Sequence, residues 1–164
     1  MKPPGKVKPI VVIGSINMDL VVRTTHLPHP GETVMGHDFQ TFHGGKGANQ
    51  AVAVARLGHP VALIGKLGRD RFGDELLAGL LAEGVRCDSL ERCDLVSGVA
   101  SIITDEGGQN SIVVTPGANS ALARKDIERR ADLIASAGMV LLQLEVPMEC
   151  VEAACKVHGY PATP

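Results

Sequence analysis

A glycine-rich stretch with one lysine, residues 44–49, is the part of the sequence best suited to hold a small ligand. It runs into an alanine-rich segment with apolar residues at helical spacing, which predicts that the glycines lead into the N-terminus of a helix. The free N–H groups and partial positive charge of such a terminus attract oxygen atoms, and glycines let a ligand approach the backbone. Lys46 adds a cation and Asn49 an amide that both donates and accepts hydrogen bonds. The stretch therefore suits a ligand rich in hydroxyls or oxyanions.

Two familiar phosphate-binding loops do not fit this stretch. A Walker A loop would need glycine at Gln40 and serine or threonine at Gly47. A dinucleotide-binding fingerprint that starts at Gly45 would need glycine or alanine at Gln50. Taken alone, the glycines also fit an ordinary tight turn before a surface helix.

Polar residues follow two expected strands. Residues 10–13 form a continuous apolar run, typical of a strand buried on both faces of a parallel sheet, and residues 139–142 form another. Asn17 and Asp19 follow the first run, and Glu145 follows the second. On an extended backbone Asn17 and Asp19 would point the same way, although an Asx turn would also explain them. Because ligands of open α/β sheets bind at the carboxyl ends of the strands, we expect an amide and carboxylates that grip neighbouring hydroxyls there.

The remaining pattern predicts an α/β fold in which strands and helices alternate. The last helix is expected to begin at Pro147 and to bury Met148, Val151 and Cys155. The other expected elements are strands at 20–23, 33–35, 61–64, 98–103 and 111–115, a turn at 65–73, and helices at 74–83 and 126–137.

Composition narrows the class of protein. The chain has 164 residues, of which 45% are hydrophobic, so it can build one globular domain with a real core. A net charge of −2, no tryptophan and a single tyrosine argue against a nucleic-acid partner. The apolar runs are too short for a membrane span, and no metal-binding spacing is found among the histidines. The four cysteines lack CxxC spacing, which indicates reduced thiols in a cytoplasmic protein.

Several motifs occur together and in order. They are Asn-Met-Asp at 17–19, Pro-Gly-Glu-Thr at 30–33, Gly-Gly-Lys-Gly-Ala-Asn-Gln-Ala at 44–51, Gly-Lys-Leu-Gly-Arg-Asp at 65–70 and Leu-Gln-Leu-Glu at 142–145. On these residues the chain resembles the PfkB-type carbohydrate kinases and, within that family, the ribokinase group. The resemblance implies a Rossmann-like parallel sheet with a small β-sheet lid, built from segments near 17–23, 33–42 and 98–115. Residues 1–164 would form the N-terminal part of the kinase domain.

The resemblance also implies an activity. This is ATP-dependent phosphorylation of D-ribose at O5 to ribose 5-phosphate, with Mg²⁺ and activation by K⁺, in a homodimer that forms through the lid. The sugar-binding residues that match the family are Asn17, Met18, Asp19, Gly44, Gly45, Lys46, Gly47, Ala48, Asn49 and Glu145.

One family signature is not in the chain. The run Asp-Thr-x-Gly-Ala-Gly-Asp, which in the family supplies the catalytic base and oxyanion hole, is not found, so the base is expected beyond residue 164. We therefore expect no catalytic or metal-binding residue here, nucleotide and K⁺ sites that are largely absent, and a missing C-terminal half. The sugar half-site would be inactive alone, with an unpaired, aggregation-prone sheet edge. The alternatives are a non-catalytic sugar-binding or lid-dimerising module, and another PfkB-family sugar or nucleoside kinase.

Overall fold

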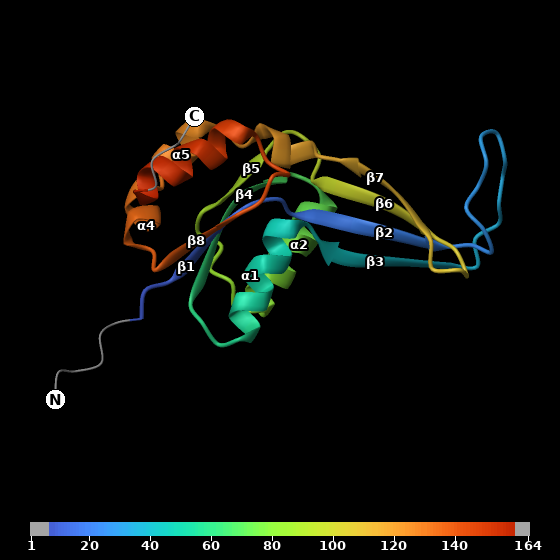
Figure 1. Cartoon of the computed structure of the whole chain (residues 1–164), viewed down its shortest axis with the longest axis horizontal. Helices are drawn as coiled ribbons and strands as arrows, with labels where there is room; N and C mark the ends of the chain where they lie inside the picture. The colour runs from blue at the N-terminus through green and yellow to red at the C-terminus, as the bar shows by residue number, and fades with distance from the viewer. Residues whose placement is uncertain (1–6, 160–164) are drawn as a thin grey trace.

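The computed structural model describes residues 7–159, which form two sheets and the helices around the first of them (Figure 1). The first sheet is parallel, with the strand order β5-β4-β1-β8. Its strands are β1 (Ile10–Ile13), β4 (Val61–Gly68), β5 (Leu90–Cys93) and β8 (Met139–Leu142). A parallel sheet with helices between its strands confirms the expected Rossmann-like fold class.

Helices cover both faces of the first sheet and create two cores. Val12 of β1 packs in one core, whereas its neighbours Val11 and Ile13 pack in the other, because successive side chains of a strand point to opposite faces. The first core contains residues of α1 (Lys46–Arg56) and α2 (Arg71–Ala82). The second contains residues of α3 (Arg124–Glu128), α4 (Ala131–Ser136) and α5 (Met148–His158).

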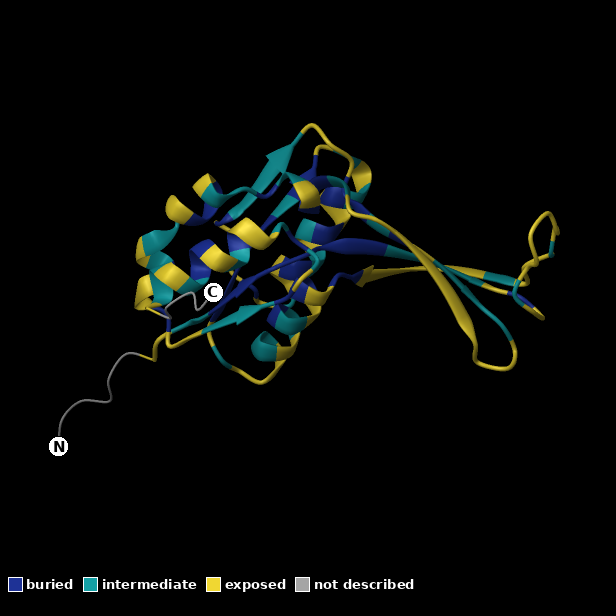
Figure 2. Cartoon of the chain, turned by 45° about the horizontal axis from the view of Figure 1, so that its top comes forward, coloured by how far each residue is buried: buried dark blue, intermediate teal, exposed yellow. Residues whose placement is uncertain are grey.

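The second sheet also has four strands and extends away from this three-layered body (Figure 1). Its order is β3-β2-β6-β7, with β2 and β6 parallel and the outer pairs antiparallel. Its strands are β2 (Asn17–Arg23), β3 (Asp38–Gly44), β6 (Gly98–Thr104) and β7 (Asn110–Thr115). Every residue of β7 is exposed, and Figure 2 shows that burial is greatest where the sheet joins the body.

Two expected boundaries were wrong in the first half of the chain. Residues 33–35 lie in a loop, and the strand of that region is β3, which pairs with β2 from Asp38 to Gly44. The expected turn at 65–73 is also wrong, because β4 continues to Gly68 and pairs with β5, a strand the sequence pattern did not reveal. Helix α2 begins at Arg71 because the carboxylate of Asp70 accepts a hydrogen bond from the N–H of Gly73 and caps it.

The helices of the second half also differ from expectation. The helix expected at 126–137 is two short helices, since the backbone leaves helical geometry at Arg130. Helix α5 turns a different face to the sheet than expected. Its buried residues are Cys150, Ala153 and Ala154, whereas the side chain of Met148 is 54% exposed. Small side chains let the helix lie close to the sheet, and this close packing selects the face.

Candidate functional site

A polar hollow of about 150 Å³ lies where the carboxyl ends of β1 and β8 meet the start of α1 and one face of the second sheet. The body contributes Lys46, Asn49 and Glu145, and β2 contributes Asn17 and Asp19. The remaining lining residues are Gly45, Ala100, Ile102, Ile112 and Val114.

The structure brings together six of the ten expected sugar-binding residues, namely Asn17, Asp19, Gly45, Lys46, Asn49 and Glu145. The other four do not line the hollow. Met18 is fully buried in the first core because it points to the opposite face of β2 from Asp19. Ala48 also packs in that core, and Gly44 and Gly47 lie behind the hollow in close contact with neighbouring segments.

The glycines are explained by packing as much as by access for a ligand. Gly45 has a φ of 91°, and a Cβ on it would lie 2.7 Å from the carbonyl oxygen of Ser15. A Cβ on Gly47 would lie 2.5 Å from the carbonyl carbon of Gly14. The N–H of Ala48 then donates to the oxygen of Ser15 at 3.0 Å. These positions need glycine because the start of α1 presses directly on the backbone that follows β1.

Asp19 occupies the space that Gly44 leaves open. The two residues lie on neighbouring strands, and a Cβ on Gly44 would lie 2.2 Å from a carboxylate oxygen of Asp19. Burial raises the pKa of the Asp19 carboxyl, the negative charge of Glu145 raises it further, and the positive charge of Lys46 partly opposes both. The Asp19 carboxylate is therefore protonated at a higher pH than an ordinary aspartate.

Lys46 forms an ion pair at the edge of the hollow, and its side chain is 67% exposed. Its Nζ lies 3.2 Å from Oε1 of Glu145, and the buried hydroxyl of Ser15 donates to Oε2 of the same carboxylate at 2.8 Å. The backbone N–H of Glu145 donates to Oε1 of Gln143, which also follows β8. Sequence reasoning missed Ser15, although its position between β1 and Asn17 was a usable signal.

Asn119 is a second residue that sequence reasoning left outside the site. It follows β7 and is 2% exposed. Its side chain donates to Oδ1 of Asn17 at 2.8 Å and to the carbonyl oxygen of Ile16 at 3.2 Å, and it accepts from the N–H of Ile16 at 2.9 Å. No sequence pattern marked Asn119, so its partner could not be inferred.

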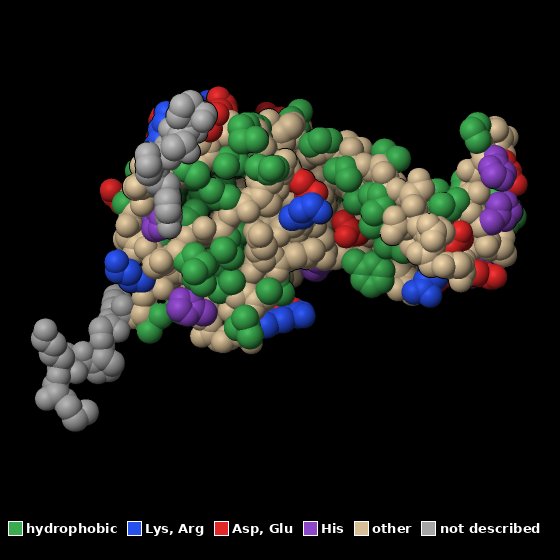
Figure 3. Space-filling model, viewed as in Figure 1, with side chains coloured by type: hydrophobic (Ala, Val, Ile, Leu, Met, Phe, Trp, Pro, Cys, Tyr) green, Lys and Arg blue, Asp and Glu red, His purple; other side chains and the backbone are tan. Residues whose placement is uncertain are grey.

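The second sheet closes the hollow with an apolar wall. Ala100 and Val114 lie beside Asp19 on the same face of this sheet, and Ile102 and Ile112 continue the row. Figure 3 shows hydrophobic side chains gathered over the second sheet among polar ones. Carboxylates that accept, an amide and an ammonium group that donate, and an apolar wall together suit a small molecule with several hydroxyls and a carbon face.

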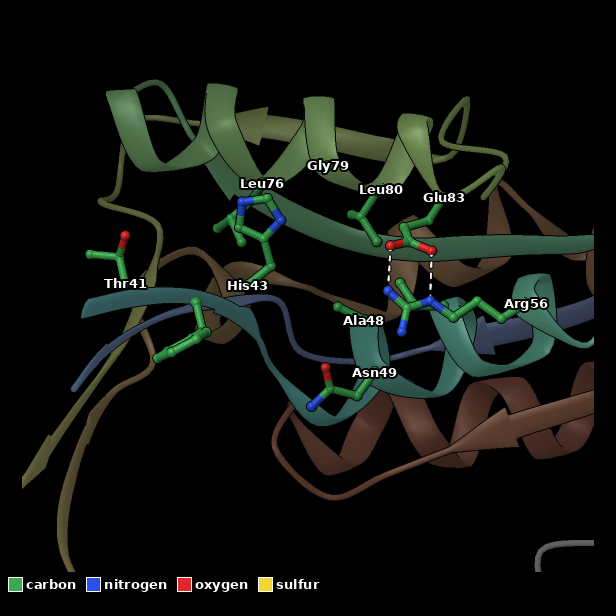
Figure 4. A pocket seen from close by; sticks show the side chains of 11 residues that line it. Thr41, His43, Ala48, Asn49, Arg56, Leu76, Gly79, Leu80 and Glu83 are labelled. Atoms are coloured by element: carbon green, nitrogen blue, oxygen red, sulfur yellow. Dashed lines mark hydrogen bonds and ion pairs between the residues drawn. The ribbon is translucent and has the colours of Figure 1, made fainter. Parts of the chain in front are cut away.

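Two other hollows lie near the site. One, of about 180 Å³, shares the lining residues Asn17, Val114 and Glu145 with the site. Asn119 also lines this hollow. The other, of about 390 Å³, lies between α1 and α2 on the far side of Asn49 (Figure 4). There the guanidinium of Arg56 binds the carboxylate of Glu83 at 2.8 Å, so these charges neutralise each other. The site that contains Asp19 is therefore the stronger candidate.

Residues 7–159 contain no group of three or more His, Cys, Asp or Glu side chains that could hold a metal ion. No helix in this part of the chain is long and apolar enough to cross a membrane.

Fold and site define an α/β protein with a partly polar hollow at the carboxyl ends of parallel strands, beneath a second sheet, which is where open α/β sheets bind their ligands. The model of the pfkB family of carbohydrate kinases matches residues 7–159, and the chain belongs to this family.

Several relatives within the family are ribokinases. The chain is 49% identical to the ribokinase of Bacillus subtilis over 148 residues, which cover 90% of this chain and 50% of the relative. It is 44% identical to the ribokinase of Schizosaccharomyces pombe, over 92% of this chain and 50% of that protein. The chain thus spans about half the length of these curated relatives.

Solved structures agree with the fold. The ribokinase of Thermotoga maritima superposes with a TM-score of 0.84 and 35% identity, over 91% of this chain and 49% of that one. The ribokinase of Arabidopsis thaliana complexed with ribose and ATP has a TM-score of 0.78 and 35% identity, over 95% and 52% of the two chains.

Proposed function

We propose that this chain is the sugar-binding part of a ribokinase-type kinase, which transfers the γ-phosphoryl group of ATP to O5 of D-ribose and yields ribose 5-phosphate. The observation that carries the proposal is the meeting of Asp19, Lys46, Asn49 and Glu145 around one hollow from distant parts of the chain. The relatives that support it are ribokinases, one of them solved with ribose and ATP.

Each group in the hollow has a distinct task in this proposal. The carboxylate of Asp19 accepts a hydrogen bond from a sugar hydroxyl, and the amide of Asn17 donates to a neighbouring hydroxyl oxygen. Asn49 can do either, and the Lys46–Glu145 ion pair borders the sugar. The apolar wall contacts the carbon atoms of the ring and keeps water away from these bonds, which strengthens them.

Phosphoryl transfer needs groups that we place outside these residues. The aspartate base and the nucleotide site are expected in the half of the kinase that lies beyond residue 164, so this chain binds sugar but does not turn it over alone. In the full kinase Mg²⁺ would neutralise the charge of the phosphates, and K⁺ would activate the enzyme. Residues 7–159 contain no group of three or more His, Cys, Asp or Glu side chains that could hold Mg²⁺. Nucleotide binding is supported by the Cryptococcus neoformans ribokinase solved with ADP.

The lid role and the homodimer belong to the same proposal. The second sheet would act as the lid over the sugar, and its apolar hollow-side face would pack on a second copy. Phe42, Ile112 and Val114 share that face and are 49%, 50% and 46% exposed. A cytoplasmic location is also proposed, and the four unpaired cysteines suit a reducing compartment.

Calorimetry with D-ribose tests the proposal directly. The wild-type chain should bind ribose, and Asp19→Asn should weaken binding by about tenfold or more, because the ionised acceptor is lost. Asp94→Asn is the matched control, since that carboxylate is 97% exposed and lies outside the hollow. A coupled assay for ADP release should show no turnover by the chain alone. Absence of ribose binding would reject the sugar site, and turnover at an ordinary kinase rate would reject the inactive half-site.

A deoxypentose is the second candidate substrate. The chain is 40% identical to a deoxyribokinase of Salmonella typhi over 92% of this chain and 50% of that protein. Calorimetry with 2-deoxy-D-ribose beside D-ribose separates the two. A site that hydrogen-bonds the extra hydroxyl of ribose would discriminate against the deoxy sugar, which lacks it. Tighter binding of the deoxy sugar would therefore favour this candidate.

A further inference from the structure

The amide of Asn17 is held in one orientation by a residue that does not line the main hollow. Asn17 and Asn119 are 102 residues apart in the chain, and both side chains are nearly fully buried. Their contact therefore depends on how the end of the β6–β7 hairpin returns to the start of β2.

The backbone of Ile16 determines which way both amides face. Its N–H can only donate, so the atom of Asn119 that meets it must be the oxygen. The NH₂ group of Asn119 is then turned to the carbonyl oxygen of Ile16 and to Asn17. Asn17 must present its own oxygen to that NH₂ group. Its Nδ2, which has no hydrogen-bond partner within residues 7–159, is consequently the atom left for the hollow.

Space for the two amides is created by Gly98. This glycine lies opposite Asn17 in the parallel pairing of β2 with β6. A Cβ on it would lie 2.2 Å from Oδ1 of Asn17 and 2.3 Å from Nδ2 of Asn119. The two amides fill a gap that any residue larger than glycine at position 98 would close. The backbone of Ile16, the β6–β7 hairpin and strand β2 therefore all support one arrangement of the two amides.

We propose that Asn119 is a positioning residue of the sugar site. It locks Asn17 as a hydrogen-bond donor, so the ligand must offer an oxygen lone pair to Asn17 while Asp19 accepts a hydroxyl hydrogen. The site thereby selects two differently oriented hydroxyls. The ligand part of this inference rests on the proposed function, whereas the orientation of the amides does not.

Solvent exchange of the side-chain amides, measured by NMR on the wild-type chain without sugar, tests the orientation. The NH₂ of Asn119 is buried and doubly bonded and should exchange at least about tenfold more slowly than that of Asn17. Equal or reversed rates would overturn the proposal. In Asn119→Asp at pH 8, the new carboxylate cannot donate, so the amide of Asn17 should rotate and its exchange should slow. Asn110→Asp, at an exposed position, is the control and should leave that exchange unchanged.

Calorimetry with D-ribose at pH 8 tests the consequence. Asn119→Asp should weaken ribose binding by about tenfold to a hundredfold, because Asn17 would then offer an acceptor. Asn17→Asp retains the bond from Asn119, so it should fold normally and show a similar loss; wild-type affinity in this variant would overturn the donor role. If Asn119→Asp does not fold, the wild-type exchange rates still test the orientation of the amides, and Asn17→Asp still tests the donor role of Asn17. If the wild-type chain binds no ribose, the proposed function fails, while the exchange rates still decide the orientation.

Discussion

Lys46, the first residue of α1, forms an ion pair of 3.2 Å with Glu145, which follows β8, and both border the hollow that contains Asp19. The pair joins the two segments of the body that the second sheet covers. It also sets the charge around Asp19, since Glu145 raises the pKa of the Asp19 carboxyl and Lys46 lowers it.

This relationship predicts a pH dependence of ribose binding. Ionised Asp19 is a stronger hydrogen-bond acceptor than the protonated acid, so affinity is highest above its raised pKa and falls as the pH drops through that value. Glu145→Gln should lower the pKa of Asp19 and move the midpoint to lower pH, whereas Lys46→Met should move it to higher pH. Calorimetry between pH 4 and pH 8 measures the midpoint. Lys156→Met, an exposed change on α5, should not move it, and shifts of the opposite sign would contradict the assignment.

A second prediction concerns the glycine behind the hollow. Gly47→Ala should lower the free energy of unfolding by about 2 kcal/mol or more, because its Cβ would overlap the backbone of Gly14. Gly107→Ala is the matched control. Its new Cβ would meet only the side chain of Asp105, at 3.2 Å, and should change stability by less than about 0.5 kcal/mol. Urea unfolding measures both, and equal stabilities would rule out the packing explanation.

The ion pair between Lys66 and Asp126 predicts a large effect on stability far from the hollow. The two atoms are 2.8 Å apart, and the side chains are 11% and 3% exposed. Lys66→Met should destabilise the fold by about 3 kcal/mol, since it leaves a buried carboxylate short of a partner. Arg69→Met, which breaks an exposed pair with Asp94, should cost less than about 1 kcal/mol. Similar losses in the two variants would argue against burial as the cause.

Acid unfolding should depend on the same aspartate. Burial opposes ionisation of Asp126, but hydrogen bonds from Lys66 and the N–H of Ala123, with the charges of Lys66 and Arg129, outweigh it and lower the pKa below 3.8. The stability it contributes is therefore present above the unfolded value of 3.8 and is lost as the pH falls through the lower folded value.

The test compares stability at two pH values. Asp126→Asn should be less stable than wild type at pH 5, and the difference should shrink by pH 3. Exposed Asp132→Asn should follow wild type at both values. A difference in stability that grew toward low pH would contradict the lowered pKa of Asp126.

The proposed dimer gives the last prediction. Sedimentation should show wild-type dimers, and Phe42→Asp should dissociate them, because it places a charge on the hollow-side face of the second sheet. Phe39→Asp places the same charge on the opposite face, where the side chain is 62% exposed, and should leave the dimer intact. A monomeric wild type would remove the dimer from the proposal.

The run 10–13 matches β1, a central strand that is covered on both faces and therefore apolar. The run 139–142 matches the position of β8, but the expected two-sided burial was wrong, because β8 is an edge strand whose residues are exposed or half-buried. In the second sheet, the expected strands at 98–103 and 111–115 match β6 and β7, but β3 was not located. Five consecutive residues of β3 are exposed, from Phe39 to His43, so nothing in their sequence distinguished them from the loop at 33–35.

The sequence by itself determined the family, the fold class and most residues of the hollow, because local spacing and residue type are enough to specify strand ends and a glycine-led helix start. Only the tertiary structure decided that Met18 points into the core, that Lys46 binds Glu145, and that Asn119 orients Asn17. These facts depend on contacts between segments far apart in the chain. Such contacts are selected by packing and by the need of buried polar groups for partners, neither of which local sequence spacing records.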